Sequence, residues 1–187
     1  MVMTGSIQRC NRPLFNVRRF PQAFTLIELV TVIVIIGLIG ISLGGPVLSY
    51  ISSVRTRGAA ARLSADIRYA QRWAMSTRNR TWVVFNVAGN SYTLYVEDPA
   101  HPGATNRQML ASALGNVTAA VSVGESPFTG AKLNSAAFGG TSELSFDSSG
   151  VPYDANGAAL ASNGQVQLAG AVTVTVRTVS GLVEVTG

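Results

Sequence analysis

The sequence predicts an α+β protein in which one long N-terminal helix precedes an antiparallel β domain. Two patterns support this fold class. Residues 29–54 are uncharged and mostly apolar, and helical spacing of apolar residues continues from there to Arg78. From Thr81 onward, apolar and polar residues alternate with a period of two between glycine-containing turns. The two patterns therefore separate a helical part, which extends to about residue 80, from a β domain of residues 81–187.

The composition is that of a folded protein with little catalytic potential. Hydrophobic residues make up 47% of the 187 residues and charged residues 12%, which excludes an intrinsically disordered chain. One Cys, Cys10, and one His, His101, leave no disulfide framework, zinc cluster or Cys/His catalytic pair. The prolines and glycine around His101 indicate a solvent-exposed loop, so we expect no metal there. No nucleotide loop, nucleophile elbow or paired catalytic carboxylates occur, and we expect neither enzymatic activity nor a cofactor.

The apolar run predicts a transmembrane helix over residues 24–48. As a helix, residues 29–54 would reach about 39 Å, against a hydrocarbon core of about 30 Å. A buried core helix is one alternative, but a domain of this size seldom encloses a helix that is apolar on all sides. A cleavable secretory signal is another, but its apolar part runs only about 7 to 15 residues. Arginines flank the run on both sides, so charge does not decide its orientation.

Residues 49–80 are predicted to continue the helix as an amphipathic segment. Pro46 predicts a kink or break before it. At about 100° per residue, one set of side chains falls within a narrow arc that should pack on a sheet, and a set of arginines lies opposite. The first set is Leu63, Ile67, Ala70 and Ala74, and the second is Arg57, Arg62, Arg68 and Arg72.

The β domain of residues 81–187 begins with a predicted hairpin. Residues 81–87 and 91–96 flank Gly89-Asn90, a favourable hairpin turn. Ser180-Gly181 is expected to turn the last pair of strands. Further strands are expected at residues 108–114, 117–123, 143–146, 165–168, 171–178 and 182–186.

The start of the apolar run resembles a known processing signal. The stretch Phe24-Thr25-Leu26-Ile27-Glu28-Leu29, between a basic leader and the apolar run, resembles the class III signal of type IV pilins and type II secretion pseudopilins. The resemblance implies that a prepilin peptidase removes residues 1–23, cutting between Ala23 and Phe24 and methylating the new amino terminus. Ala23 stands where the family usually has Gly, and Pro46 lies one residue after the family's usual helix-kinking proline.

Glu28 needs a partner if it enters the bilayer. A carboxylate costs about 2.5 to 3.5 kcal/mol at the bilayer centre and less near the interface. One interpretation is that Glu28 stays hydrated at the headgroup boundary. In the family that the signal resembles, this glutamate pairs with the methylated amino terminus of a neighbouring subunit during filament assembly, and neutralisation favours packing of the helices.

The whole chain after the leader resembles the GspH/FimT type of minor pilin-like proteins. The segment Phe146-Asp147-Ser148-Ser149-Gly150, followed by a strand and a terminal hairpin, resembles the C-terminal half of that family. The resemblance implies a non-enzymatic minor pseudopilin of a type II secretion pseudopilus, assembled with other pseudopilin subunits near the filament tip. It also implies a single-pass anchor in the bacterial inner membrane with the C-terminal domain in the periplasm.

The alternatives are a FimT-like minor pilin of a type IV pilus or competence system that binds DNA, and a secreted β domain with an uncleaved anchor. The leader carries four Arg and no acid, so its removal lowers the formal net charge from +5 to +1. Residues 55–80 then carry net +6 and residues 81–187 net −4. DNA-binding FimT members carry Gly-Arg-x-Arg in the terminal turn, where this chain has Gly181-Leu182-Val183-Glu184. We therefore expect the arginines to meet acidic domains of adjacent subunits rather than DNA.

Overall fold

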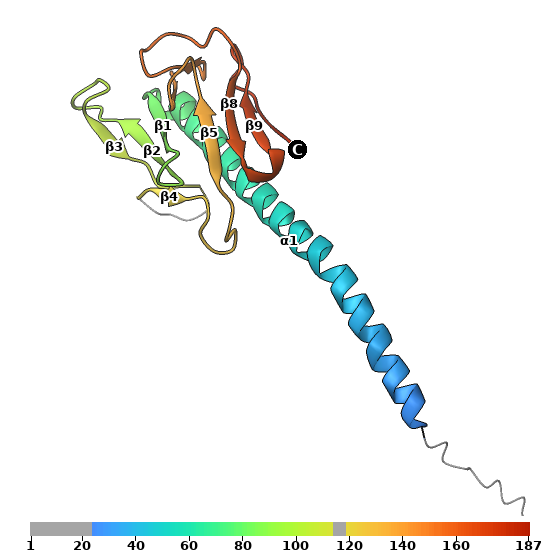
Figure 1. Cartoon of the computed structure of the whole chain (residues 1–187). Helices are drawn as coiled ribbons and strands as arrows, with labels where there is room; N and C mark the ends of the chain where they lie inside the picture. Colours follow the sequence, from blue (N-terminus) through green and yellow to red (C-terminus); the bar gives the residue numbers. More distant parts are fainter. Residues whose placement is uncertain (1–23, 114–118) are drawn as a thin grey trace, which may run out of the picture. The chain divides into compact units, whose positions relative to one another are not determined.

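The computed structural model describes residues 24–113 and 119–187, apart from the side chains of residues 41–46 (Figure 1). Helix α1, Leu26–Thr77, runs through both of the compact units into which the chain divides. The first unit extends to Leu43 and the second comprises residues 44–187. The predicted end of the helix near Arg78 is confirmed. Helix α1 continues through residue 46, and the side chain of Pro46 lies outside the described part of the structure.

In the first unit, a hydrogen bond to the Thr25 side chain caps the start of helix α1. Thr25 precedes the helix, and its hydroxyl accepts a hydrogen bond of 3.3 Å from the backbone N–H of Glu28. The backbone carbonyl of Thr25 also accepts from the N–H groups of Glu28 and Leu29. Within the described residues, no helical segment is both long enough and apolar enough to cross a membrane.

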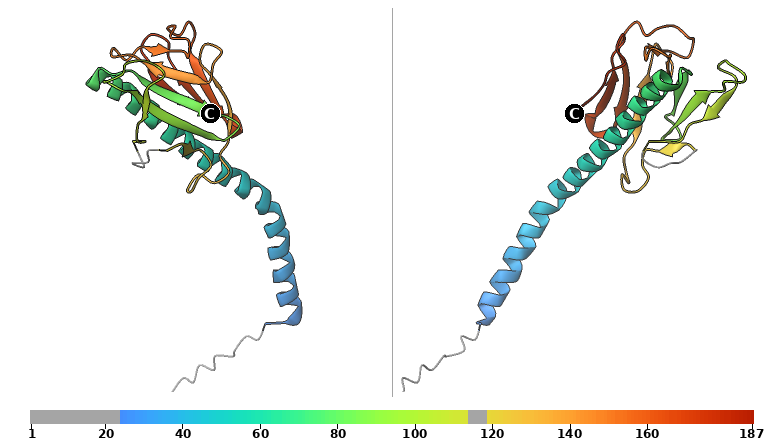
Figure 2. Two further views of the ribbon diagram at one scale, coloured as in Figure 1. Left: turned by 90° about the vertical axis from the view of Figure 1, so that its left-hand side faces the viewer. Right: turned by 180° about the vertical axis from the view of Figure 1, so that it is seen from behind.

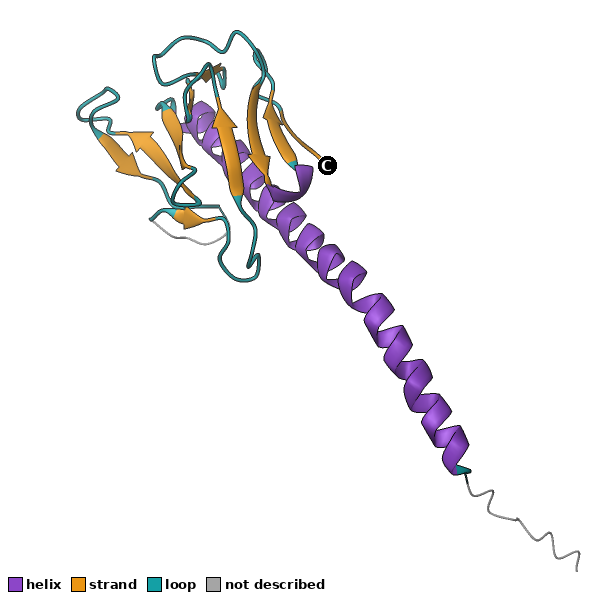
Figure 3. Ribbon diagram, viewed as in Figure 1, coloured by secondary structure: helices purple, strands orange, loops and turns teal. Residues whose placement is uncertain are grey.

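The second unit contains two antiparallel sheets, which Figure 3 shows in orange. The first sheet consists of β1 (Thr81–Asn86), β2 (Ser91–Glu97), β3 (Arg107–Met109), β4 (Val121–Ser122), β6 (Glu143–Phe146) and β7 (Pro152–Tyr153). Its order is β3-β2-β1-β6-β7, and β4 also pairs with β2. The second sheet consists of β5 (Leu133–Ala137), β8 (Gly164–Leu168), β9 (Thr173–Val176) and β10 (Val183–Thr186), in the order β10-β9-β8-β5.

The predicted hairpins are confirmed. In the first, Thr81 pairs with Val96 and Asn86 with Ser91. In the last, β10 pairs with β9, and Gly181 takes the positive φ of 63° that the turn requires. The strand predicted over 143–146 is β6, and β7 is the strand expected after the 146–150 segment.

Three strand predictions were too long, and one strand was missed. The 108–114 strand ends at Met109, because the chain turns toward α1, where Ser112 and the Ala113 N–H bond to Asp66. Of 117–123, only β4 is a strand among the described residues. The 171–178 strand begins at Thr173, after a 3-10 turn, Ala169–Ala171, in which Gly170 has a φ of 70°. The missed strand, β5, consists of small and polar residues after Leu133, with little strand propensity, and it pairs with β8.

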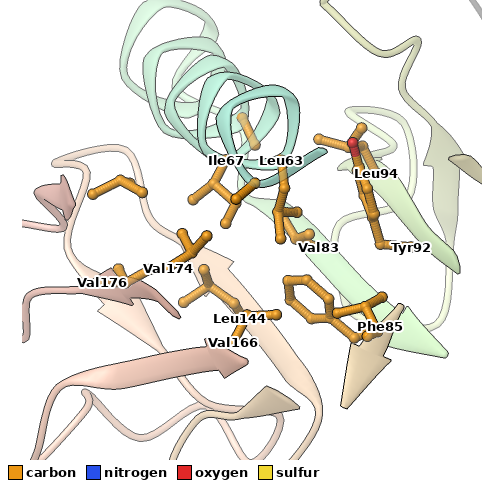
Figure 4. Close-up of a cluster of buried hydrophobic side chains, with 14 of the residues drawn as sticks. Leu63, Ile67, Val83, Phe85, Tyr92, Leu94, Leu144, Val166, Val174 and Val176 are labelled. Carbon is orange, nitrogen blue, oxygen red and sulfur yellow. The ribbon is translucent and has the colours of Figure 1, made fainter. Parts of the chain in front are cut away.

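The core of the second unit forms where α1 meets side chains of both sheets (Figure 4). The predicted inward row is confirmed, since Leu63, Ile67, Ala70 and Ala74 all have an exposed fraction of 0%. Full burial of a Leu or Ile side chain contributes about 1.5–3 kcal/mol, so this row attaches the helix firmly to the sheets. Strand residues of the same cluster include Val83, Leu144, Val166 and Val174.

Two glycine-containing turns pack against the C-terminal part of α1. The side-chain amide of Gln71 donates to the carbonyls of Gly150 and Ser180, each at 2.9 Å. Gly150 and Gly181 both have positive φ, of 78° and 63°. A Cβ at Gly181 would overlap the Gln71 amide and come within 2.8 Å of the Gly150 carbonyl. Gln71 therefore joins the terminal hairpin and the turn before β7 to the helix.

This close approach predicts the cost of adding one methyl group. Gly181→Ala should destabilise the fold by about 1–3 kcal/mol more than Gly157→Ala, as measured by chemical unfolding of the full chain. Gly157 is the matched control, because its φ of 77° imposes the same backbone strain with nothing within 4 Å of an added Cβ. Equal destabilisation by the two substitutions would contradict the packing described at Gly181.

Candidate subunit interface

The predicted processing and assembly residues gather at the start of α1, apart from Ala23, which lies outside the described residues. Phe24 precedes the helix and its side chain is 77% exposed. Glu28 lies in the first turn, is exposed, and forms no ion pair with another described residue. An anion in the first helical turn is favourable because the N-terminal end of the helix carries partial positive charge. Within the described part of the chain, Glu28 thus remains available to a cation.

From Leu26 to Ile39, helix α1 exposes apolar side chains on all of its faces. Their exposed fractions range from 40% at Val30 to 82% at Leu26. Nothing in the described part of the first unit covers them, and burial of such area contributes about 25 cal/mol per Å². We call these residues the N-terminal apolar surface: Leu26, Ile27, Leu29, Val30, Val32, Ile33, Val34, Ile35, Ile36, Leu38 and Ile39.

The predicted arginine face is confirmed at three of its four positions. Arg57, Arg68 and Arg72 are exposed, and none forms a salt bridge with a described acidic residue. The expectation was wrong for Arg62, which is half-buried, with its Nε buried and without a hydrogen-bond partner in the described structure. The charge of Arg62 acts on the pKa of Tyr92, which it lowers, against larger effects that raise it.

In the terminal hairpin, an apolar side chain is exposed and the glutamate is paired with an arginine. Leu182 is 53% exposed. The Glu184 carboxylate accepts hydrogen bonds from Arg177, at 2.9 Å from Nη2 and 3.1 Å from Nε. Because this arginine is already paired, the hairpin offers no unpaired cation to a phosphate backbone.

His101 lies beside an acidic side chain. Its Nδ1 lies 3.2 Å from the Asp98 carboxylate in an exposed loop. The backbone N–H of Ala100, and next His101, hold the pKa of Asp98 below its ordinary value by hydrogen bonding to the carboxylate. Residues 24–113 and 119–187 contain no group of three potential metal ligands.

Sequence reasoning missed a buried carboxylate, Asp66, at the border of the inward row. Its exposed fraction is 0%. It accepts hydrogen bonds from the Tyr92 hydroxyl at 2.6 Å, the Ser112 hydroxyl at 2.9 Å and the Ala113 N–H at 2.9 Å. These donors come from β2 and from the segment after β3, so Asp66 ties both to α1. Buried charges require such satisfied networks.

A helical-wheel projection of the sequence could have indicated this buried carboxylate. Asp66 is the only acid among the arginines of residues 55–80, and at 100° per residue it lies at the edge of the arc of Leu63, Ile67 and Ala70. Its partners cannot be read from the wheel, because Tyr92 and Ser112 approach it only through the tertiary fold.

Tyr92 is held in its neutral form by this environment. Burial, the charge of Asp66 and the hydrogen bond to Asp66 all raise the pKa of Tyr92 above its ordinary value, against an opposing effect of Arg62. The neutral hydroxyl is required for donation to the carboxylate. The network is therefore stable while the phenol stays protonated.

Comparison with known proteins identifies the fold. No protein-family model and no curated protein matches the sequence. The structure is similar to that of the minor pseudopilin EpsH from the Type 2 Secretion System of Vibrio cholerae, with a TM-score of 0.51. The two chains are 13% identical, and the match covers 70% of this chain and 94% of EpsH. The chain thus has a fold similar to that of the EpsH structure.

The raised pKa of Tyr92 predicts a loss of stability in alkali. Unfolded Tyr92 ionises near its ordinary pKa of 10.0, whereas the folded state keeps the proton. Above that pH the folded state binds more protons, so stability falls as pH rises. Tyr92→Phe should cost about 1 kcal/mol at pH 7 and make the alkaline decline shallower in urea unfolding. Tyr50→Phe, at a 71% exposed position, is the control, and an unchanged slope in Tyr92→Phe would contradict the network.

Proposed function

We propose that the protein is a non-enzymatic minor pseudopilin subunit of a type II secretion pseudopilus. The observation that carries this proposal is the N-terminal apolar surface, with Glu28 at its start, on a chain whose fold is that of a pseudopilin. A surface that is apolar all round needs a cover, and the described residues of the first unit do not supply one. Membrane lipid supplies this cover before assembly, and the helices of other pseudopilins supply it in the filament.

Processing and assembly follow from the charges at the start of the helix. We propose that a prepilin peptidase removes residues 1–23 and methylates the amino terminus of Phe24. The new ammonium group of one subunit then pairs with Glu28 of another, because an unpaired carboxylate in apolar surroundings is costly. Glu28 thereby couples correct assembly to charge neutralisation.

The proposed location is the bacterial inner membrane, crossed once by residues 24–48, with the C-terminal domain in the periplasm. The exposure of the N-terminal apolar surface supports the membrane anchor. We place the subunit near the filament tip, among other pseudopilins, with a kink at Pro46 between the anchor and the amphipathic continuation of the helix.

A FimT-like, DNA-binding role in a type IV pilus or competence system is the second candidate. The exposed Arg57, Arg68 and Arg72 favour it, because clustered arginines attract phosphate. The terminal turn opposes it, since Leu182 and the paired Glu184 stand where a DNA-binding turn has arginines. Deletion strains scored for protein secretion, twitching and transformation distinguish the two roles.

Processing at the Ala23–Phe24 bond predicts the mass of the mature chain. Protein extracted from membranes should begin at Phe24 and carry one added methyl group, as measured by intact mass and N-terminal sequencing. A chain that begins near residue 45 would instead indicate a conventional signal peptide and would contradict the filament proposal.

Pairing in the filament predicts that Glu28→Gln blocks assembly without blocking insertion or cleavage. The substitution removes the charge and keeps the apolar helix at full length. Crosslinking to other pseudopilins in cells should fall to background, while membrane extraction and mature mass stay normal. Glu125→Gln, an exposed acid in the β domain, is the matched control. Wild-type crosslinking yield in Glu28→Gln would show that the carboxylate is dispensable.

A further inference from the structure

The second unit contains an open groove between α1 and the start of β10. It has a volume of about 370 Å³. Both apolar side chains and arginines line the groove. All of its lining residues belong to the second unit, residues 44–187. Its lining residues are Ala65, Arg68, Gln71, Arg72, Leu182 and Val183.

The apolar part of the groove is accessible. Leu182 is 53% exposed, although it is an apolar residue at the start of an edge strand. Ala65 is half-buried and carries only a methyl group, so a partner side chain can approach the helix closely. An apolar group in the groove would remove both side chains from water, which is favourable in proportion to the area covered.

The cationic part is positioned for a carboxylate. Arg68 and Arg72 are four residues apart on α1, which brings their Cβ atoms to about 5–6 Å from each other. The Nη2 of Arg68 donates to the Val183 carbonyl at 2.6 Å, which holds its guanidinium beside β10. Arg72 forms no hydrogen bond or salt bridge with another described residue. The unused N–H groups match the oxygens of a carboxylate, which arginine binds with defined geometry.

We propose that this groove binds a segment of a partner protein in which an aspartate or glutamate lies next to an apolar side chain. The carboxylate pairs with Arg72 and with the free N–H groups of Arg68, and the apolar side chain lies on Ala65 and Leu182. The apolar floor favours a peptide over a nucleic acid, whose phosphates would use the arginines and leave Leu182 uncovered. This inference goes beyond the filament role and does not depend on the N-terminal apolar surface.

A random dodecapeptide phage library tests the groove directly. The library is panned against the full chain in detergent micelles, and the enriched peptides are made with a fluorescent label for anisotropy titration. We expect enrichment of Asp or Glu within two residues of Leu, Ile, Val or Phe. Arg72→Gln should weaken binding by about tenfold, and Leu182→Ser by a few-fold.

Two exposed positions outside the groove provide matched controls. Arg57→Gln removes the same charge from the same helix, and Val179→Ser removes an apolar side chain, 83% exposed, from the same hairpin. Both should change the dissociation constant by less than twofold. The absence of any enriched sequence, or equal binding by all four variants, would overturn the proposal. So would displacement of the peptide by duplex DNA together with unchanged binding in Leu182→Ser, which would define a general anion site.

Discussion

The burial of one helical row, Leu63, Ile67, Ala70 and Ala74, is the contact on which the rest of the second unit depends. The two sheets and α1 contribute to one core cluster, so each sheet needs this row to cover its inner side chains. Figure 2 shows the ribbons of the sheets and of α1 from two further sides. Polar contacts at the borders of the row then set the rotation of the helix. Asp66 binds Tyr92 and the segment after β3, and Gln71 binds two glycine turns. Apolar burial supplies most of the stabilisation, and these hydrogen bonds fix the position of α1 relative to the two sheets.

Helix α1 carries two surfaces that no described residue of their own unit covers. In the second unit, the buried row occupies one side of α1, so Arg57, Arg68 and Arg72 remain outside the core, and Arg68 and Arg72 line the groove beside β10. In the first unit, the N-terminal apolar surface is exposed. The proposed filament role requires both a stable domain and surfaces that other molecules can cover.

The sequence was sufficient wherever periodicity or a turn determines structure locally. The inward row followed from helical spacing, and the hairpin of β1 and β2 followed from alternation around Gly89-Asn90. Strand β5 could not be predicted, because its small and polar residues form a strand only through pairing with β8. The Asp66 network was missed for the same reason, since its donors lie 26 to 47 residues away along the chain. Long-range hydrogen bonds leave little trace in a single sequence.

The central claim is that the two halves of α1 are covered differently, the first by other molecules and the second by its own β domain. Single cysteines in a Cys10→Ser chain test it through labelling by a membrane-impermeant maleimide in intact cells with a permeabilised outer membrane. We predict that Val34→Cys and Ala70→Cys are both protected, and that Val179→Cys, at an 83% exposed position outside the groove, is labelled readily. Urea should release protection at Ala70, and only detergent should release it at Val34. Labelling of Val34→Cys as fast as Val179→Cys in intact cells would contradict the account.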